Sequence, residues 1–569
     1  MNHPIFHLDL RNPEQHLIKV LLKFKAASVG QKLQLPCWTP GSYLQRDYVK
    51  HLEGIEASCN GKRSPLQRLD QHSWRITAAL PGDLIEIGYA LLAGEASVRT
   101  NWLDHQGGFL TAAAWALQVP EYRWHPHQLE LHLPAGWQLA TGLSSNADGS
   151  LLARDFDQLV DSPIALGNLQ QLEFSVGGVS HRWVWQGLLN AAPVQQWQQD
   201  LPRLCAAACA LMGCQRPPAD QYLFMTRFCG DGYGGLEHDN SAALLFSRRE
   251  LATAAGYRRL LQLVGHEYLH QWNVRRLRPQ ELRPYNYGAG VIVPSLWFAE
   301  GITSYFDQLL LVVAGLCSTT DYLRDLSVDI SRYRTTPGRA VQSLQQSSEE
   351  AWVKLYKRDS HSDNQQLSYY LKGQLVALLL DLHLLSIGSC LTDLLGNLWR
   401  CFGASERGYS QADLLAATAD LAPDLGPLLQ HWLTSVDELP LDSYLKEVGM
   451  RLIPKHPNSP FSGLHLETVQ GQVRVTRVER HSPGEQAGLS PGDELLALDG
   501  ERLRQGEQLD LWIRSGVQHQ LLFCSDGAVR ECCLYPAVAR PGHWQLQSDP
   551  SASVVACQLR HRWLWRQES

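Results

Sequence analysis

The spacing of the hydrophobic residues changes twice along this chain, and each change restricts the fold of the segment that follows. Up to about residue 170, apolar residues alternate with polar ones in short stretches such as 128–133, and Pro/Gly/Asn/Asp turns such as 81–83 separate them. This pattern predicts an antiparallel β-sandwich. Short alternating segments return over 461–540, which predicts a small β-rich module. Between these two regions the apolar residues recur at helical spacing, over 197–213, 250–273, 299–314, 368–386 and 410–436.

A chain of 569 residues is too long for one hydrophobic core, so several domains are expected. We expect a multidomain α+β protein with a β-sandwich over 1–170, a mainly helical domain over 171–452 and a β-rich module over 460–545. Three prolines between residues 454 and 460 mark a linker before the last module. Between the helical segment 197–213 and the later helices, the central domain is expected to contain two strands, 221–227 and 242–246, with a Gly-rich loop, 229–238, between them.

Composition excludes several classes of partner. The chain is 44% hydrophobic and 19% charged, its formal net charge is −7, and it has no block of like charges. We therefore expect neither a nucleic acid nor a membrane as a partner. The N-terminus shows no signal-peptide pattern, and the longest apolar run, 309–316, is far short of the ~20 residues of a membrane span. The 13 cysteines are odd in number and form no Cys-x-x-Cys pair, which predicts reduced, mostly buried thiols in the cytoplasm.

The strongest chemical signal is a His-Glu-x-x-His pattern, His266 to His270, inside a predicted amphipathic helix. Residues four apart share one face of a helix, so the two histidines can bind one metal ion. Glu267 beside them is placed to reach a metal-bound water rather than the metal. Because these five residues also occur together by chance, the surrounding sequence has to support the interpretation.

Glu300, thirty residues further on, begins another predicted helix and can supply the third ligand of a catalytic zinc, which keeps its fourth position for water. We expect one zinc ion per chain. Without the histidine pair, Glu300 would be interpreted as a surface carboxylate near a helix start. Ser304, one turn later, either orients a ligand from the second shell or simply packs in the helix.

This region resembles the glycyl aminopeptidase family, whose members are zinc peptidases with a thermolysin-like catalytic domain similar to that of aminopeptidase N. The similarity lies in residues 266–273, in Arg275 and Arg278-Pro279, and in Glu300-Gly301. Three further segments match family signatures: Trp38-Thr-Pro-Gly-Ser-Tyr43, Gly234-Gly-Leu-Glu-His238 and Tyr370-Leu-Lys-Gly373.

The resemblance implies a role for each matching residue. Glu267 would be the general base, and Tyr370 would hydrogen-bond the oxyanion of the tetrahedral intermediate. Glu237, with Gly234 and Gly235, would bind the substrate and its free α-amino group. From spacing alone, Tyr370 would be a core tyrosine and Glu237 an acidic residue of a flexible loop. The residue after this Glu is Asn in aminopeptidase N relatives but His238 here, which weakens the inference for the amine-binding geometry.

Two other features leave alternatives open. Arg275, Arg276 and Arg278 are interpreted either as a clamp for a substrate carboxylate or as a solvated helix end, and the helix end is the commoner case. Residues 482–500 resemble a PDZ domain, with 463–466 as its carboxylate-binding loop. That module either captures a peptide C-terminus or packs on the catalytic domain as a structural appendage.

The sequence thus predicts a cytoplasmic zinc aminopeptidase that removes Gly or Ala from the amino terminus of peptides. One alternative is a zinc endopeptidase, in which Glu237 does not close the cleft. Another is a PDZ-based peptide-binding protein with a relic peptidase domain, which the presence of all five metal-site and catalytic residues disfavours. The expected partner is a peptide substrate, and the oligomeric state is open.

Overall fold

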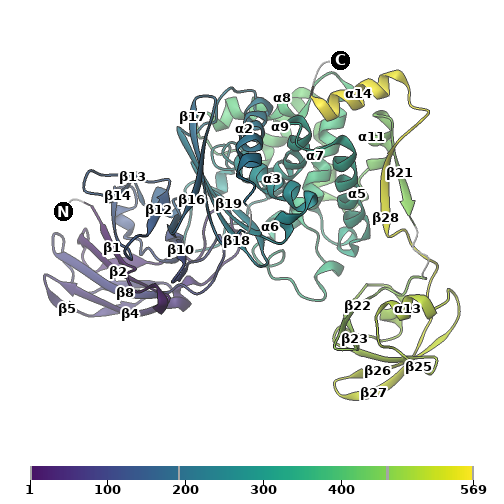
Figure 1. Cartoon of the computed structure of the whole chain (residues 1–569), viewed down its shortest axis with the longest axis horizontal. Coiled ribbons are helices and arrows are strands. Elements are labelled where there is room, and N and C mark those ends of the chain that lie inside the picture. Colours follow the sequence, from purple (N-terminus) through teal and green to yellow (C-terminus); the bar gives the residue numbers. More distant parts are fainter. Residues whose placement is uncertain (1–2, 190–191, 456–459, 567–569) are drawn as a thin grey trace. The chain divides into compact units, whose positions relative to one another are not determined.

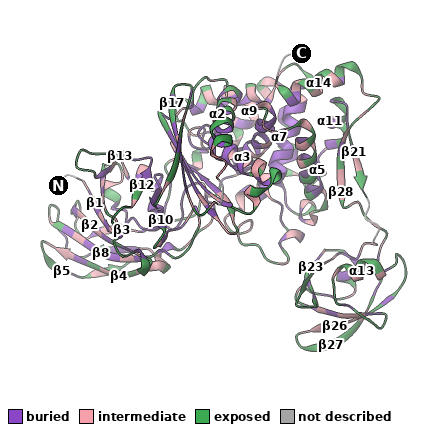
Figure 2. Ribbon diagram, in the orientation of Figure 1, coloured by how far each residue is buried: buried purple, intermediate pink, exposed green. Residues whose placement is uncertain are grey.

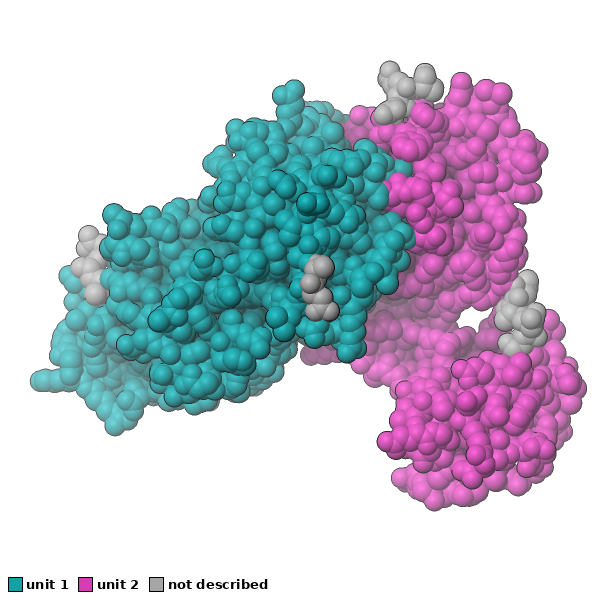
Figure 3. All heavy atoms as spheres, in the orientation of Figure 1, with its two compact units in different colours: residues 1–293, 306–316, 395–410 teal, residues 294–305, 317–394, 411–569 magenta. Residues whose placement is uncertain are grey.

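The structure is a computed structural model, and it describes residues 3–189, 192–455 and 460–566 (Figure 1). The chain divides into two compact units (Figure 3). The first comprises 1–293, 306–316 and 395–410, and the second comprises 294–305, 317–394 and 411–569. Among the described residues no single helix is long and apolar enough to cross a membrane, although one bent pair, 362–386 with 391–403, passes on length and composition.

The N-terminal region of the first unit consists of β-sheets, as its alternating sequence predicts. Strand β2 (Leu17–Lys25) buries every second side chain, and it pairs antiparallel with β8 (Leu84–Leu92) at the centre of an eight-stranded sheet. One pair departs from the expected antiparallel arrangement, because β1 (Ile5–Asp9) pairs in parallel with β11 (His127–His132). A four-stranded sheet lies in the same region and contains β9 (Trp102–Asp104), β10 (Gly107–Leu110), β12 (Gln138–Thr141) and β15 (Ile164–Gly167).

A five-stranded sheet follows in the first unit, in the order β16-β17-β18-β20-β19. The predicted strands are present as β18 (Gln221–Cys229) and β20 (Ser241–Ser247). The segment between them is not a flexible loop, because Tyr233–Glu237 forms strand β19 at the edge of the sheet. Glycines normally weaken a strand, so composition alone predicted a loop. In the structure, other groups approach this strand so closely at Gly235 that only glycine fits, which explains why a strand contains it. The two remaining strands are β16 (Gln170–Val176) and β17 (Val179–Gln186).

Helix α3 (Ala254–Leu269) carries the His-Glu-x-x-His pattern. Thr253 caps its N-terminus by accepting a hydrogen bond from the Gly256 amide through its side-chain oxygen. The helix ends four residues before the predicted end at 273. The chain turns after Leu269, and Val274 adopts a positive φ of 140°, which a helix does not allow.

The π-helical turn η7 (Trp297–Gly301) belongs to the second unit and continues directly into α4 (Ile302–Val313), most of which belongs to the first unit. Helix α7 (Tyr369–Ser386) of the second unit is almost entirely buried (Figure 2). The predicted helix over 410–436 is two helices, α9 (Gln411–Leu421) and α10 (Leu425–Thr434), because Pro423 interrupts it.

The predicted β-rich module has the antiparallel order β22-β23-β24-β26-β27. It is inserted between β21 (Met450–Lys455) and β28 (His543–Ser548), which pair with each other. Helix α14 (Val554–Trp565), which the sequence did not predict, then packs on α7. Most of the predicted linker, 456–459, lies outside the described residues. The strands of the module are β22 (Leu464–Val469), β23 (Gln472–Val478), β24 (Glu494–Leu498), β26 (His519–Ser525) and β27 (Ala528–Leu534).

All 13 cysteines are free thiols. The prediction that most of them are buried is wrong, since only Cys37, Cys205 and Cys209 are buried.

Candidate metal centre

Helix α3 places His266 and His270 one turn apart, with ring centroids separated by 4.7 Å. His266 Nδ1 lies 2.8 Å from Asp307 Oδ2, and His270 Nδ1 lies 2.7 Å from the carbonyl oxygen of Asn273. Both rings are thus oriented through Nδ1, so that coordination falls to Nε2. A hydrogen bond from the second ring nitrogen to a carboxylate or carbonyl is the usual arrangement of a zinc-binding histidine.

Glu300 completes a set of three donors. The ligand atoms of His266, His270 and Glu300 all lie within 4.8 Å of one another. Two imidazoles and one carboxylate are a common ligand set of catalytic zinc, and the buried positions of His270 and Glu300 match such a site. The residues present therefore fit a zinc ion.

Asp307 is a residue of this centre that the sequence analysis missed. It lies on α4, seven residues after Glu300, and its second oxygen accepts a hydrogen bond from Gln262 at 2.9 Å. Seven residues are two helical turns, so Glu300 and Asp307 share a face. This spacing, and an acidic residue in a helix as apolar as α4, could have identified it. That Ser304 orients a metal ligand stays a prediction.

Glu267 lies against the edge strand β19 and is 5% exposed. A Cβ atom built on Gly235 would lie 2.0 Å from Glu267 Oε1, so only glycine fits at this point of the strand. The carboxylates of Glu237 and Glu267 and a ring nitrogen of His270 also lie within 4.8 Å of one another. The two carboxylates predicted for catalysis and amine binding therefore converge beside a predicted metal ligand.

Glu237 is 3% exposed, and its Oε1 atom has no hydrogen-bond partner among the described residues. The Trp38–Tyr43 signature lies directly against it. A Cβ atom on Gly41, where φ is +80°, would lie 2.6 and 2.5 Å from the two carboxylate oxygens of Glu237. Trp38 fixes this loop, since its Nε1 atom donates to the carbonyl oxygen of Asn286 at 2.6 Å. The N-terminal signature therefore encloses Glu237, a role that the sequence did not reveal.

Tyr370 begins helix α7, and its hydroxyl lies 3.0 Å from that of Tyr356. Burial, followed by the nearby charge of Glu300, raises the pKa of Tyr370 well above its usual value, so the hydroxyl keeps its proton. The two motif glycines, Gly301 and Gly373, bring the helices together: a Cβ atom on Gly301 would lie 2.5 Å from the Cα of Gly373. These glycines allow the close approach of η7 and α7 that places Tyr370 near Glu300.

The arginines after α3 do not form a solvated helix end. Arg275 is 3% exposed, and it pairs with Asp161 at 2.8 Å and Asp239 at 2.9 Å. Asp161 also lies 3.0 Å from His238 Nδ1. This buried cluster fixes the two residues that follow Glu237, and it occupies the guanidinium that a substrate clamp would need.

The comparisons with known proteins agree with this geometry. The family model of the peptidase M61 N-terminal domain matches residues 5–168, that of the M61 glycyl aminopeptidase matches 259–376, and that of a PDZ domain matches 474–523. A solved aminopeptidase N family protein from Idiomarina loihiensis is 29% identical, with a TM-score of 0.92 over 99% of this chain and 100% of the other.

Two more distant similarities are found. A zinc metalloprotease homologue from Pasteurella multocida is 29% identical over 100 residues, which is 17% of this chain and 22% of the relative. An M1 zinc metallopeptidase structure from Deinococcus radiodurans is 15% identical, with a TM-score of 0.49 over 77% of this chain and 95% of the other. Models of the M61 glycyl aminopeptidase family thus match the N-terminal and peptidase regions, and the similarity to the Idiomarina structure runs along the whole chain, which together identify this protein as a metallopeptidase.

Proposed function

We propose that this protein is a zinc-dependent aminopeptidase that removes an N-terminal Gly or Ala from peptides. One zinc ion per chain would be held by His266, His270 and Glu300. The observation that carries the proposal is the convergence of Glu237, Glu267 and His270 within 4.8 Å of one another.

Charge is the reason that this convergence favours an aminopeptidase. Two carboxylate charges this close to each other repel. The zinc ion would offset part of this repulsion, and the α-ammonium group of a substrate would offset the rest by pairing with Glu237. An endopeptidase offers no such cation, because its substrate presents an uncharged peptide group at the same place.

In the reaction, Glu267 accepts a proton from the attacking water and returns it to the leaving amine. When bound, zinc supplies Lewis acidity to the scissile carbonyl and lowers the pKa of a coordinated water. Tyr370 keeps its proton and donates a hydrogen bond to the oxygen on which negative charge develops. Glu237 holds the amino terminus, which fixes the scissile bond one residue away.

Preference for a small first residue is supported by the family resemblance and by Gly41. The backbone of Gly41 stands so close to the Glu237 carboxylate that little room remains around the bound amine. A bulky first residue would have to displace the Trp38–Tyr43 loop.

The test pairs Gly-Xaa with acetyl-Gly-Xaa peptides, on the wild type and on Glu237→Ala, alongside a zinc analysis of the purified protein. We expect about one zinc per chain. The blocked peptide should be nearly inert, and Glu237→Ala should lose most of the activity on the free peptide. Comparable wild-type rates on the two peptides would instead identify an endopeptidase, and they would leave the zinc assignment intact.

For the PDZ module we propose capture of a peptide C-terminus. Strand β22 is an edge strand, and Gly463, with a φ of +73°, precedes it at the predicted carboxylate-binding loop. The module also contacts the helical part of its unit, where Asn364 donates to the carbonyl oxygen of Val478 at 2.7 Å, so an additional structural role fits. Stronger binding of free than of amidated peptide C-termini would support capture. A cytoplasmic location stays our proposal, supported by the absence of any disulfide among the 13 cysteines.

A further inference from the structure

Strand β19 has one free edge, on which the residues with outward-facing backbone groups can be identified. The His238 amide donates to the Ser241 carbonyl at 2.9 Å and closes the hairpin with β20. In an antiparallel pair, hydrogen-bonded and non-hydrogen-bonded residues alternate. Leu236 therefore faces β20 with its backbone groups, while those of Gly235 and Glu237 face away from it. A substrate that extends along this edge would meet these outward groups.

Arg99, from the N-terminal region, already binds one of the outward-facing backbone groups of β19. Its Nη2 atom donates to the Gly235 carbonyl at 2.8 Å. This bond agrees with the outward orientation of Gly235, and it places the Arg99 guanidinium at the free edge, two residues from Glu237.

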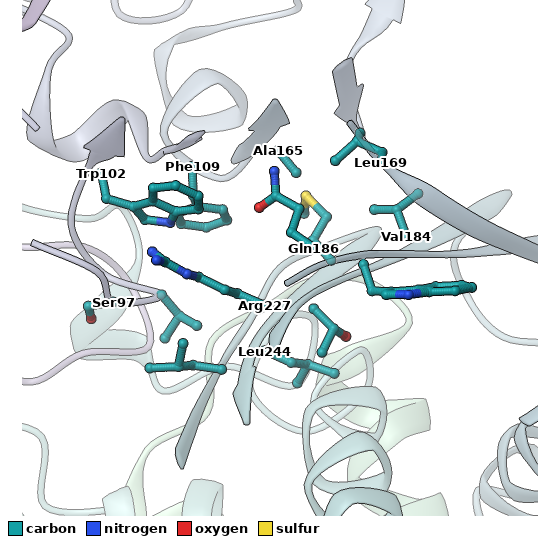
Figure 4. Close-up of a pocket in the computed structure, with 14 residues that line it drawn as sticks. Ser97, Trp102, Phe109, Ala165, Leu169, Val184, Gln186, Arg227 and Leu244 are labelled. Atoms are coloured by element: carbon teal, nitrogen blue, oxygen red, sulfur yellow. The ribbon is translucent and has the colours of Figure 1, made fainter. Parts of the chain in front are cut away.

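The loop around Arg99 is anchored on both sides. Val98 and Trp102 are buried in one apolar cluster with Leu236 of β19 itself. The Arg227 guanidinium lies beneath the Trp102 ring, 3.6 Å from its centroid, at the cavity shown in Figure 4. The carbonyl oxygen of Arg99 also accepts a hydrogen bond from the Tyr48 hydroxyl at 2.8 Å. The Arg99 backbone is thus held in place before any ligand arrives, which reduces the entropy lost on binding.

The charge of Arg99 is available to a ligand. Across the residues that the structure describes, no carboxylate forms an ion pair with its guanidinium, whereas Arg275 is fully engaged by Asp161 and Asp239. The side chain is half-buried, and the bond to Gly235 uses one of its five N–H donors. The planar Arg99 guanidinium, with its unused N–H donors, can hydrogen-bond both oxygens of a carboxylate.

The spacing along the strand gives the length of the ligand. Gly235 and Glu237 are two residues apart, or about 6.8 Å at ~3.4 Å per residue. An extended dipeptide has the same length between its two ends. With its ammonium at Glu237 and its chain antiparallel to β19, a dipeptide would present its terminal carboxylate at Arg99.

We propose that Arg99 binds the C-terminal carboxylate of the substrate and makes dipeptides the preferred substrate class. This proposal rests on the aminopeptidase function proposed above. It assigns to Arg99 the clamp that the sequence suggested for the arginines after the metal-site helix.

The test compares Ala-Ala, Ala-Ala-amide and Ala-Ala-Ala as substrates. In the wild type, kcat/KM should be highest for Ala-Ala, because only this peptide places a carboxylate at Arg99. Arg99→Ala should lower kcat/KM for Ala-Ala roughly tenfold to a hundredfold, mainly through KM, and should change the value for the amide little. Arg99→Lys should recover part of the preference, and Arg248→Ala, which removes an exposed arginine after β20, should leave it unchanged.

Each other outcome is informative. If the wild type cleaved the amide as well as Ala-Ala, or if Arg99→Ala kept the preference, the carboxylate proposal would be overturned while the aminopeptidase function stood. If Arg99→Ala lowered the rates on all three peptides equally, Arg99 would only support strand β19, which also overturns the proposal. Failure of the wild type to cleave any of the three would overturn the aminopeptidase function itself.

Discussion

At the scale of single residues, the site depends on side chains that hold other side chains. Asp307 orients His266, and Gly41, which has no side chain, leaves space for the Glu237 carboxylate. Neither is itself a predicted ligand or catalytic group. Substitution of either residue should therefore change the metal affinity or the geometry of the site, but not the type of reaction that is catalysed.

We expect Asp307→Asn to weaken zinc binding about 10- to 100-fold while the fold is kept, because an amide orients His266 less strongly and makes its imidazole less basic. The measurement is zinc retention against a series of chelator concentrations. Asp420→Asn, the same change at an exposed position of helix α9, is the matched control and should retain zinc like the wild type. Equal retention by Asp307→Asn and the wild type would contradict the assignment of Asp307.

A second prediction concerns pH. Lys372 is 1% exposed, its Nζ donates to the Ser435 carbonyl, and burial lowers its pKa to about 8, from 10.5 in the unfolded chain. Between these two pKa values the unfolded state binds more protons, so the free energy of unfolding rises with pH across that window. The rise is on the order of 3 kcal/mol and is complete above the unfolded pKa.

Lys372→Met should remove this rise, and Lys446→Met, at an exposed position, should not. Urea unfolding of each variant at pH 7.5 and pH 10 measures the difference. Parallel pH dependences of the wild type and Lys372→Met would show that the lysine is as solvated in the folded state as in the unfolded one.

At the scale of elements, close backbone approaches decide which side chains meet. Gly301 and Gly373 let the turn η7 reach α7, and Gly235 lets α3 reach β19. Each approach joins segments that are distant in the sequence. A glycine that only permits a contact can therefore be as important for the geometry of the site as a residue that makes the contact.

Gly373→Ala should therefore disturb the site. Its Cβ atom would lie 2.8 Å from the Trp297 carbonyl oxygen, which forces α7 away from η7 and Tyr370 away from Glu300. We expect a loss of about 1–3 kcal/mol in the free energy of unfolding, together with reduced kcat. Gly396→Ala in helix α8 (Leu391–Leu398) is the control, because its Cβ atom would meet only Arg400 Nη1 at 3.6 Å. An unchanged kcat in Gly373→Ala would show that the position of Tyr370 does not depend on this helix crossing.

The sequence predicted the parts of the site that are local. His266 and Glu267 lie in helix α3 and His270 is its C-cap residue, and the apolar period predicted that helix. It did not predict the edge strand β19, because the groups that crowd Gly235 and Gly41 come from other parts of the chain. The contacts between Gly41 and Glu237 and between Arg99 and Gly235 each join residues more than a hundred positions apart, and no periodic pattern encodes them.

At the scale of the whole chain, the last residues that the structure describes pack in the second compact unit. Trp563 Nε1 donates to the Tyr305 hydroxyl at 3.0 Å, and Arg566 Nη1 donates to Asp381 Oδ1 at 2.9 Å. Asp381 lies on α7 and is fully buried. Arg566, the C-cap residue of helix α14, thus supplies the positive charge that compensates a buried carboxylate of helix α7.

Arg566→Ala should lower the free energy of unfolding by about 3–5 kcal/mol, because it leaves the Asp381 charge buried without its cation. Adding Asp381→Asn to that variant should recover part of the loss, which a double-mutant cycle of denaturant midpoints would measure. If the double variant lost more free energy of unfolding than the two single variants lose in sum, the two residues would not form a compensating charge pair.

The insertion of the PDZ module between β21 and β28 also affects how the enzyme is made. Tyr370, the last of the predicted site residues, is synthesised roughly 170 residues before the start of β28, and translation proceeds at ~5–20 residues per second. During those seconds the nascent chain contains every predicted ligand and catalytic group, but not the strand that pairs with β21 or the helix that covers α7. The peptidase therefore completes its fold only after the PDZ module has been synthesised, and a ribosome that stalls within that module leaves an unfinished protease.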